Sequence, residues 1–282
     1  MSNNNLKLEE FKVVTYKKGK AKFPKKATNK FLHLHSSTAS ENFNLETAIR
    51  RIETAKNELV SSDLYASVLA SLREGLQILN SVEIREIVCF GLGNVDDCMI
   101  SRYQFALLLL LKELYKAKVI LYDPIFNDDD HAILKNFELN VLSYNNEGKY
   151  QLVHSSTTIF FLPHCPKQLS NNLLWANWGL SLSYCIVIAN SFTKIIETHS
   201  KRHILENAPY ILNISPFVTE LPIINTFKYF DIFNDLAIHI FPLENLSFIS
   251  EDFWQYRIEP KYSEEEVEFI SNSDMTVLDF NN

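Results

Sequence analysis

Two hydrophobic periodicities divide the chain. Between residues 43 and 80, apolar residues recur three and four positions apart, which predicts two helices at about 43–60 and 62–80. From residue 85 onward the pattern changes to short apolar, β-branched runs that are separated by helical stretches. In chain order these runs are EIVCF, KVILY, NVLSY, TIFFL, CIVIA, ILNIS and AIHIF.

Alternation of such runs with helices predicts a mostly parallel sheet covered by helices on both faces. The runs are nearly continuous in apolar residues, as expected of strands that are buried on both sides. The expected fold is therefore α/β: a doubly wound, mostly parallel, Rossmann-like (methyltransferase-like) sheet with an N-terminal helical extension. The last run, AIHIF, follows a segment punctuated by Pro209, Pro216 and Pro222 and is a candidate for an antiparallel edge strand.

The helix after the first strand has its own start signal. Ser101 and Gln104 have the S-x-x-Q spacing of a capping box, which predicts a helix from about Arg102 to about Ala117. Its first turns are apolar all round, so we expect this helix to be buried.

These patterns predict four parts: a disordered basic tail at 1–40, a helical extension at 41–84, an α/β domain at 85–260 and an acidic tail at 261–282. A chain of 282 residues with 46% hydrophobic residues can bury a sizeable core. The longest apolar runs are far shorter than the roughly 18 residues of a membrane span, so no association with a membrane is expected. The N-terminus lacks the apolar stretch of a secretory signal, which favours the cytoplasm and also permits the nucleus.

Charge is unevenly distributed. The formal net charge is −7, yet eight lysines lie between Lys12 and Lys30, and no acidic residue occurs between Glu10 and Glu41. Such a basic arm can bind nucleic acid weakly or act as a nuclear localisation signal, and it can equally be a solvated tail. The acidic body argues against nucleic-acid binding as the main activity, because phosphate contacts need a cationic surface.

Glycines and a carboxylate mark the first candidate site. Gly91, Gly93 and Asn94 lie in the loop after the run that ends at residue 90, and Asp123 ends the next run. In a doubly wound sheet, ligands bind outside the carboxyl ends of the strands, where glycines admit a phosphate or adenosine and a carboxylate accepts hydrogen bonds from ribose hydroxyls. Nicotinamide and S-adenosylmethionine sites share this arrangement.

The match to a dinucleotide site is incomplete. The G-x-G-x-x-G fingerprint has Asp96 at its third glycine position, followed by Asp97, and two carboxylates there would repel a pyrophosphate. Asp123 also lies farther downstream than the usual spacing of about 20 residues. A less anionic adenosine ligand such as S-adenosylmethionine fits better, and a purely structural turn remains an equal alternative.

A second group of residues is expected at the same crevice. His164 and Cys165 lie between Pro163 and Pro166 at the end of the fourth run. A Cys-His pair can serve as nucleophile and base or as metal ligands, but adjacent residues rarely point at each other, and no third partner is evident. Cys165 followed by proline could also offer a thiolate to haem iron, which is the less favoured ligand. Polar residues at two further strand ends complete the set: Asn190, Ser191, Asn234 and Asp235.

Several classes of site are not indicated. The four cysteines show no CxxC pairing, and His199 and His203 lack the glutamate of an H-E-x-x-H motif, so no metal site is predicted. There is no G-x-S-x-G elbow or Walker loop. The catalytic residues, if the protein is an enzyme, are therefore unknown from the sequence.

Taken together, the motifs resemble those of the sensitivity-to-red-light-reduced (SRR-like) proteins. The resemblance extends over about residues 87 to 240 and rests on the order and spacing of eight segments: CFGLGN at 89–94, RYQFALLL at 102–109, VILYDPIF at 119–126, NNEGKY at 145–150, FLPHCP at 161–166, ANW at 176–178, ANSF at 189–192 and FNDLAIH at 233–239.

This resemblance implies a regulatory protein of the cytoplasm and nucleus, linked in plants to light input to the circadian clock and in animals to haem biosynthesis and clock-gene expression. It implies protein partners and supplies no reaction. Three hypotheses follow: a regulator that binds partners, an S-adenosylmethionine-dependent methyltransferase-like enzyme, and a haem-responsive regulator. The positions that match the polar motifs of the family are Gly91, Gly93, Tyr103, Gln104, Asp123, His164, Cys165, Asn190, Ser191, Asn234 and Asp235.

Overall fold

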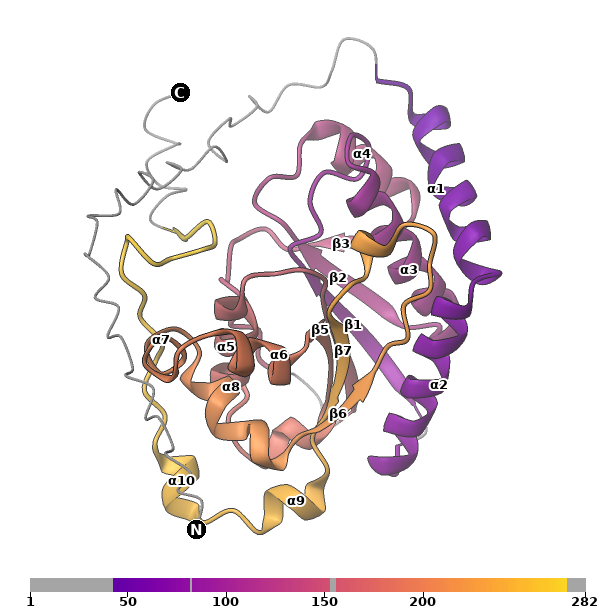
Figure 1. The fold of residues 1–282 in the computed structure, drawn as a ribbon. Coiled ribbons are helices and arrows are strands. Elements are labelled where there is room, and N and C mark those ends of the chain that lie inside the picture. The colour runs from indigo at the N-terminus through magenta and orange to yellow at the C-terminus, as the bar shows by residue number, and fades with distance from the viewer. Residues whose placement is uncertain (1–42, 82, 153–155, 273–282) are drawn as a thin grey trace, which may run out of the picture. The chain divides into compact units, whose positions relative to one another are not determined.

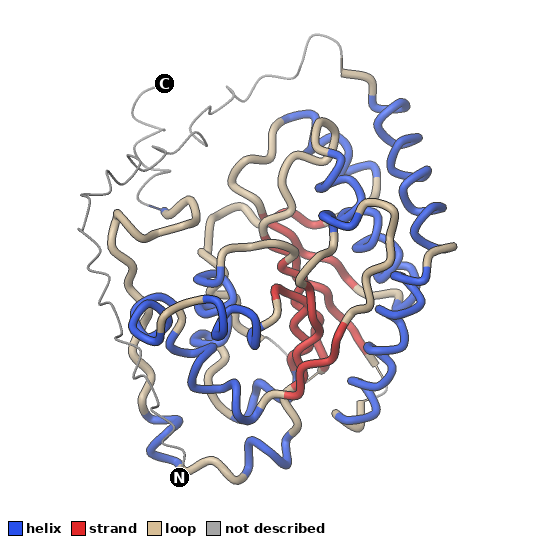
Figure 2. Tube along the Cα trace, viewed as in Figure 1, coloured by secondary structure: helices blue, strands red, loops and turns tan. Residues whose placement is uncertain are grey.

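The computed structural model describes residues 43–81, 83–152 and 156–272. The predicted basic tail at 1–40 lies outside these residues, as does the end of the predicted acidic tail. The described part of the chain forms a central sheet with helices on both faces (Figures 1 and 2).

The sheet contains seven strands within the described ranges, in the order β3-β2-β1-β4-β5-β7-β6. Strands β1 to β5 pair in parallel, and β7 pairs antiparallel with both β5 and β6. This arrangement confirms the doubly wound, mostly parallel fold, and the antiparallel β7 between β5 and β6 gives it the strand order of a methyltransferase-like sheet. The bounds are β1 (Ile84–Phe90), β2 (Lys118–Tyr122), β3 (Asn140–Val141), β4 (Thr157–Leu162), β5 (Cys185–Asn190), β6 (Thr219–Pro222) and β7 (Leu236–Ile240).

Helices cover the sheet in two layers. The helices are α1 (Leu45–Val60), α2 (Asp63–Ile78), α3 (Met99–Tyr115), α4 (Asp128–Asn136), α5 (Lys167–Ala176), α6 (Phe192–Thr198), α7 (Lys201–Asn207), α8 (Pro209–Ile214), α9 (Leu243–Ser247) and α10 (Glu251–Gln255). Three short 3-10 turns add to them: η1 (Leu180–Tyr184), η2 (Ser215–Phe217) and η3 (Phe230–Ile232). Residues of α1 to α4 share one hydrophobic core with the sheet, and residues of α5 to α8 share the other.

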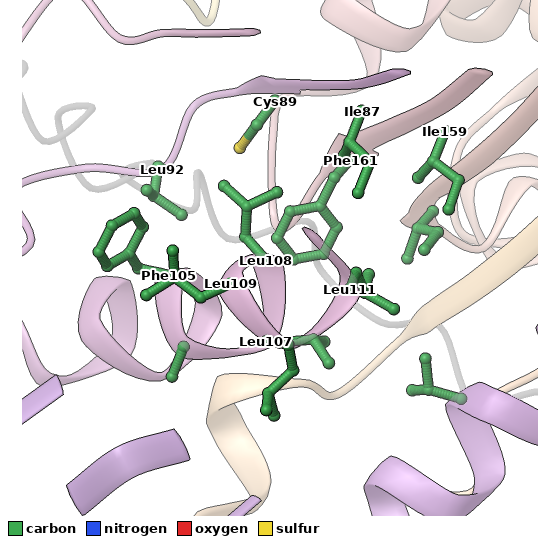
Figure 3. Close-up of a cluster of buried hydrophobic side chains, with 14 of the residues drawn as sticks. Ile87, Cys89, Leu92, Phe105, Leu107, Leu108, Leu109, Leu111, Ile159 and Phe161 are labelled. Carbon is green, nitrogen blue, oxygen red and sulfur yellow. The ribbon is translucent and has the colours of Figure 1, made fainter. Parts of the chain in front are cut away.

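Alternate residues of the central strands supply the two cores. In β1, Ile87 and Cys89 belong to the core under α3, whereas Val88 and Phe90 belong to the core under α5. Figure 3 shows Ile87 and Cys89 beside the leucines of α3. Because residues 87–90 of β1 and 159–162 of β4 are buried on both faces, these stretches are apolar at every position.

The two N-terminal helices agree with the predicted pattern. Asn44 caps α1 by accepting a hydrogen bond from the Thr47 main chain at 2.8 Å, and Ser62 caps α2 by accepting one from Tyr65 at 3.2 Å. The face of α1 that carries Ile52 is buried in the same core as α3. These helices therefore pack onto the sheet through the stripe of apolar residues, three and four positions apart, that predicts them.

One predicted strand is a helix, and another has a different place in the sheet. Residues 211–215, ILNIS, were expected in the sheet but lie largely in α8, because Pro209 occupies its first turn, where a missing N–H costs nothing. The antiparallel direction of β7 is confirmed, but its edge position is wrong: β6 covers it and forms the edge. The short segment Thr219–Pro222 has too few apolar residues to be recognised as a strand from sequence.

The predicted capping box at the start of α3 is also wrong. The helix begins at Met99, with Cys98 at the cap position and no side-chain capping hydrogen bond. Ser101 and Gln104 lie inside the helix and are buried, and the Gln104 amide donates to the Ile232 carbonyl at 3.1 Å. Tertiary contact with η3, rather than local capping, explains the glutamine.

Leu108 is fully buried in α3, against the sheet (Figure 3), whereas Leu114 of the same helix is 49% exposed. We expect Leu108→Ala to lower the free energy of unfolding by about 2 to 5 kcal/mol, because it removes buried methyl groups and leaves a cavity. Leu114→Ala, the matched control, should cost less than about 1 kcal/mol. Urea unfolding followed by circular dichroism measures both, and equal losses would contradict this packing.

Candidate functional site

The loops that follow β1, β2, β4 and β5 meet at the carboxyl ends of these strands, and we call this end of the sheet the rim. The Gly93 main chain donates to Asp123 Oδ2 at 2.8 Å and thereby joins the loop after β1 to the end of β2. The Asn190 amide donates to the Cys165 carbonyl at 3.0 Å, which joins the end of β5 to the loop after β4. The structure therefore brings segments far apart in sequence to the same edge.

Asp123 is a buried carboxylate that accepts hydrogen bonds from the loop after β1 and from the loop after β2. Its Oδ1 accepts from the Ile125 main chain at 3.0 Å, while its Oδ2 accepts from Gly93. Burial raises the pKa of Asp123 above its ordinary value, assisted by the charge of Asp130, although the two main-chain hydrogen bonds act in the opposite direction. Each carboxylate oxygen thus already has a donor from the protein itself.

Asp130 is a second buried carboxylate at the rim, and sequence reasoning missed it. It is fully buried, and its Oδ1 accepts from the Val95 main chain at 2.7 Å. Its Oδ2 accepts from the Asn94 amide at 2.7 Å and from the Asn127 main chain at 3.1 Å. The capping box formed by Asn127 and Asp130 at the start of α4 is the signal that could have revealed it. Asn94 is thereby directed at another loop of the protein.

Cys165 fills the point where the strand order reverses, between β1 and β4. Gly91 has a left-handed φ of 66°, and a Cβ atom placed on it would lie 2.3 Å from Cys165 Sγ. The thiol is buried and donates to the Phe90 carbonyl at 3.1 Å. Burial, with a contribution from the charge of Asp123, raises the pKa of Cys165 well above its usual range, so the group is a neutral thiol. Gly91 therefore accommodates a side chain of the protein itself.

His164 takes a different direction from Cys165. It is exposed and has a left-handed φ of 54°, a conformation that Asp235 shares with a φ of 58°. Partial burial of the imidazole lowers the pKa of His164, while the charge of Asp235 and a hydrogen bond with the Ile232 main chain act against that change. The adjacent histidine and cysteine do not form a nucleophile-base pair in this arrangement.

Ser191, which follows β5, connects the start of α6 to β6. Ser191 caps α6 by accepting from the Lys194 main chain at 3.0 Å, and its hydroxyl also hydrogen-bonds to Glu220 of β6. Glu220 accepts from the Thr193 main chain at 3.0 Å. Although burial raises its pKa, the His239 ring, whose Nε2 lies 3.5 Å from Glu220 Oε2, and the hydrogen bonds from Ser191 and the Thr193 main chain lower the pKa of Glu220 to about 2. No local pattern in the sequence identifies Glu220, because its partners come from the start of α6 and from β7.

A partly open hollow lies at the other end of the strands. It has a volume of about 610 Å³ and lies at the amino ends of β1, β4 and β5. None of the strand-end residues named above as candidate site residues lines it. The lining residues are Leu79, Asn80, Ser81, Glu83, Arg85, Ser156, Thr157, Ser183, Tyr184 and Leu243.

The helices bear on one further prediction. Within the described residues, no helix combines the length and the apolar character needed to cross a membrane.

The sheet order and the rim define a doubly wound α/β protein with a methyltransferase-like strand arrangement, whose strand-end loops are tied together by buried polar groups. A family model described as the SRR1 domain matches residues 68–240. The chain therefore belongs to the SRR1 family, as its motifs indicated.

Individual relatives agree with this assignment. An SRR1-like protein of Drosophila melanogaster is 29% identical over 278 residues, which are 95% of this chain and 94% of the relative. The Arabidopsis thaliana protein SENSITIVITY TO RED LIGHT REDUCED 1 is 24% identical over 68% of this chain and 74% of its own length. Among solved structures, the plantazolicin methyltransferase BpumL in complex with SAH covers 69% of this chain and 86% of its own, with a TM-score of 0.32 and 13% identity. A likeness of that size bears on neither ligand nor reaction.

We expect Asp123→Asn to lower the free energy of unfolding by about 1 to 3 kcal/mol, because an amide group would face one of the two main-chain donors. Asp97→Asn, an exposed position in the loop after β1, also replaces an aspartate by asparagine and should have little effect. Urea unfolding at pH 7 provides the comparison. An Asp123→Asn protein as stable as the parent would show that the two hydrogen bonds do not hold the rim.

Glu220 should make stability depend on pH in the acidic range. Its pKa in the folded protein is about 2, below the ordinary value of 4.5, so its contribution is complete above pH 4.5 and is lost as the pH falls toward 2. We expect Glu220→Gln to be less stable than the parent at pH 6 and to lose less stability between pH 5 and pH 2.5. Urea midpoints across that range test this, and parallel pH curves for both proteins would contradict it.

Proposed function

We propose that this chain is a regulatory protein of the cytoplasm and nucleus that acts by binding partner proteins. Its membership of the SRR1 family, together with the plant relative, supports a regulatory role. The resemblance on which this proposal rests further implies a part in regulating haem biosynthesis and the expression of circadian clock genes.

One observation carries the choice of a regulator over an enzyme: both oxygens of Asp123, the carboxylate at the end of β2, accept hydrogen bonds from main-chain donors of the protein itself. In an adenosine site, the carboxylate after the second strand accepts hydrogen bonds from ribose hydroxyls. In this chain the two oxygens of Asp123 accept from Gly93 and Ile125, at 2.8 and 3.0 Å. The Cys165 side chain also lies against Gly91, at the point of the sheet where ligands of doubly wound folds bind.

The second candidate is an S-adenosylmethionine-dependent methyltransferase-like enzyme. The strand order favours it, as do the left-handed Gly91 and Gly93 next to a carboxylate at the end of β2. For such a ligand to bind, the hydrogen bond between Gly93 and Asp123 would have to open. The free energy needed to open this hydrogen bond would make the binding free energy of the ligand less favourable by the same amount.

Calorimetric titration separates the two candidates. For the purified chain we expect no saturable heat with S-adenosylmethionine or S-adenosylhomocysteine at about 1 mM. Binding with a Kd near 1 mM, a binding free energy of about −4 kcal/mol, would be detected at that concentration. Saturable binding that Asp123→Ala weakens about tenfold or more would favour the enzyme instead. The same samples can be mixed with haem, for which a Soret shift that Cys165→Ser abolishes would indicate thiolate ligation.

A further inference from the structure

The polar face of α5 is covered by the segment that follows α10. Gln168, Asn171 and Asn172 are fully buried. In Figure 1 the segment after α10, drawn in yellow, runs beside α7 and α5. Buried amides need hydrogen-bond partners, and here residues 262–268, which we call the strap, supply several of them.

Gln168 recognises the main chain of the strap. Its Nε2 donates to the Glu266 carbonyl at 2.9 Å, and its Oε1 accepts from the Glu268 N–H at 2.8 Å. These two hydrogen bonds go to main-chain atoms of the strap, so they do not depend on the side chains at those positions. In known modes of peptide recognition, such main-chain bonds give affinity while separate side-chain contacts give specificity.

Two side chains of the strap have specific places on α5. The Tyr262 hydroxyl donates to Asn172 Oδ1 at 2.7 Å and accepts from Asn171 Nδ2 at 3.0 Å. Lys167 Nζ lies 2.5 Å from Glu268 Oε1, and the lysine side chain is only 5% exposed. A buried ammonium group needs a counter-charge, so this position selects a carboxylate.

The strap is held by polar contacts and buries little apolar surface. None of its residues is fully buried, and Tyr262 and Val267 are the two that are half-buried. Segments that bury little apolar surface belong to the least stable parts of a fold and open locally. Opening would leave α5 with the Lys167 charge and three amide side chains without these partners, and a similar segment of another protein could supply them.

We propose that this face of α5 is a docking groove for an acidic peptide segment of a partner protein, and that the strap occupies the groove until the partner displaces it. The groove fits a segment with a tyrosine, a turn and a carboxylate six positions later, as Tyr262 and Glu268 are placed in the strap. This inference rests on the proposed partner-binding function and names the chemistry of the partner.

A labelled peptide with the sequence of residues 258–272 is the probe, and fluorescence anisotropy with the full-length chain is the measurement. We expect the double variant Tyr262→Phe, Glu268→Gln to bind the probe at least tenfold more tightly than the parent chain. In the parent, the intact strap competes at the high effective concentration of a tethered segment, and the two substitutions weaken that competitor.

Three controls make the result specific. Glu265→Gln, an exposed strap position, should leave probe binding at the level of the parent. A probe that carries the same two substitutions should bind the double variant at least tenfold more weakly, and this control alters no folded protein. Gln168→Ala added to the double variant should abolish binding while circular dichroism confirms that the protein is folded.

Absence of probe binding to the double variant would overturn the groove. Equal affinities of the two probes, or of the parent and the double variant, would overturn it as well. The outcome is distinguishable from failure of the proposed function: saturable heat with S-adenosylmethionine would contradict a partner-binding regulator and leave the anisotropy result unchanged.

Discussion

Burial of the central strands on both faces is the constraint on which the rest of this structure depends. β1 and β4 contribute alternate side chains to two separate cores, so neither strand has a face for polar chemistry. Polar groups are therefore confined to the two ends of the strands. Because β1 to β5 are parallel, the loops after them share one edge, and Gly93, Asp123, Cys165 and Asn190 become neighbours there.

The rim shows how such neighbours can be used. A buried carboxylate needs donors, and in a ligand-binding sheet a bound molecule can supply them. In this protein the donors are the main chains of Gly93 and Ile125 for Asp123, and the Val95 main chain and the Asn94 amide for Asp130. The same residue types that mark a ligand site in sequence thus serve as a clamp between loops. This is why glycines beside a carboxylate are weak evidence for a cofactor by themselves.

The α5 face differs from the rim in where its partners come from. The buried carboxylates of the rim accept hydrogen bonds from loops of the sheet, and each of these loops is anchored by a buried strand. The amides of α5 take some of their partners from Asn207, Tyr210 and Glu147 and the others from a strap without a fully buried residue. Polar groups of similar kind therefore belong to a stable scaffold in one place and to an exchangeable contact in the other. The strength of the anchoring, and not the type of residue, makes the distinction.

The amino-acid sequence by itself determined the fold class, the two N-terminal helices and the family, because these depend on local periodicity and on motif order. It also indicated that the residues near Gly93, Asp123 and His164 follow strand ends. Only the tertiary structure decided that ILNIS lies mainly in a helix, that β6 forms the edge, and that Cys165 turns inward while His164 turns outward. It also revealed Asp130, Glu220 and the cover over α5. Hydrophobic patterning reports whether a residue is buried, whereas the partner of a polar group is set by chain segments distant in sequence, whose approach no local pattern encodes.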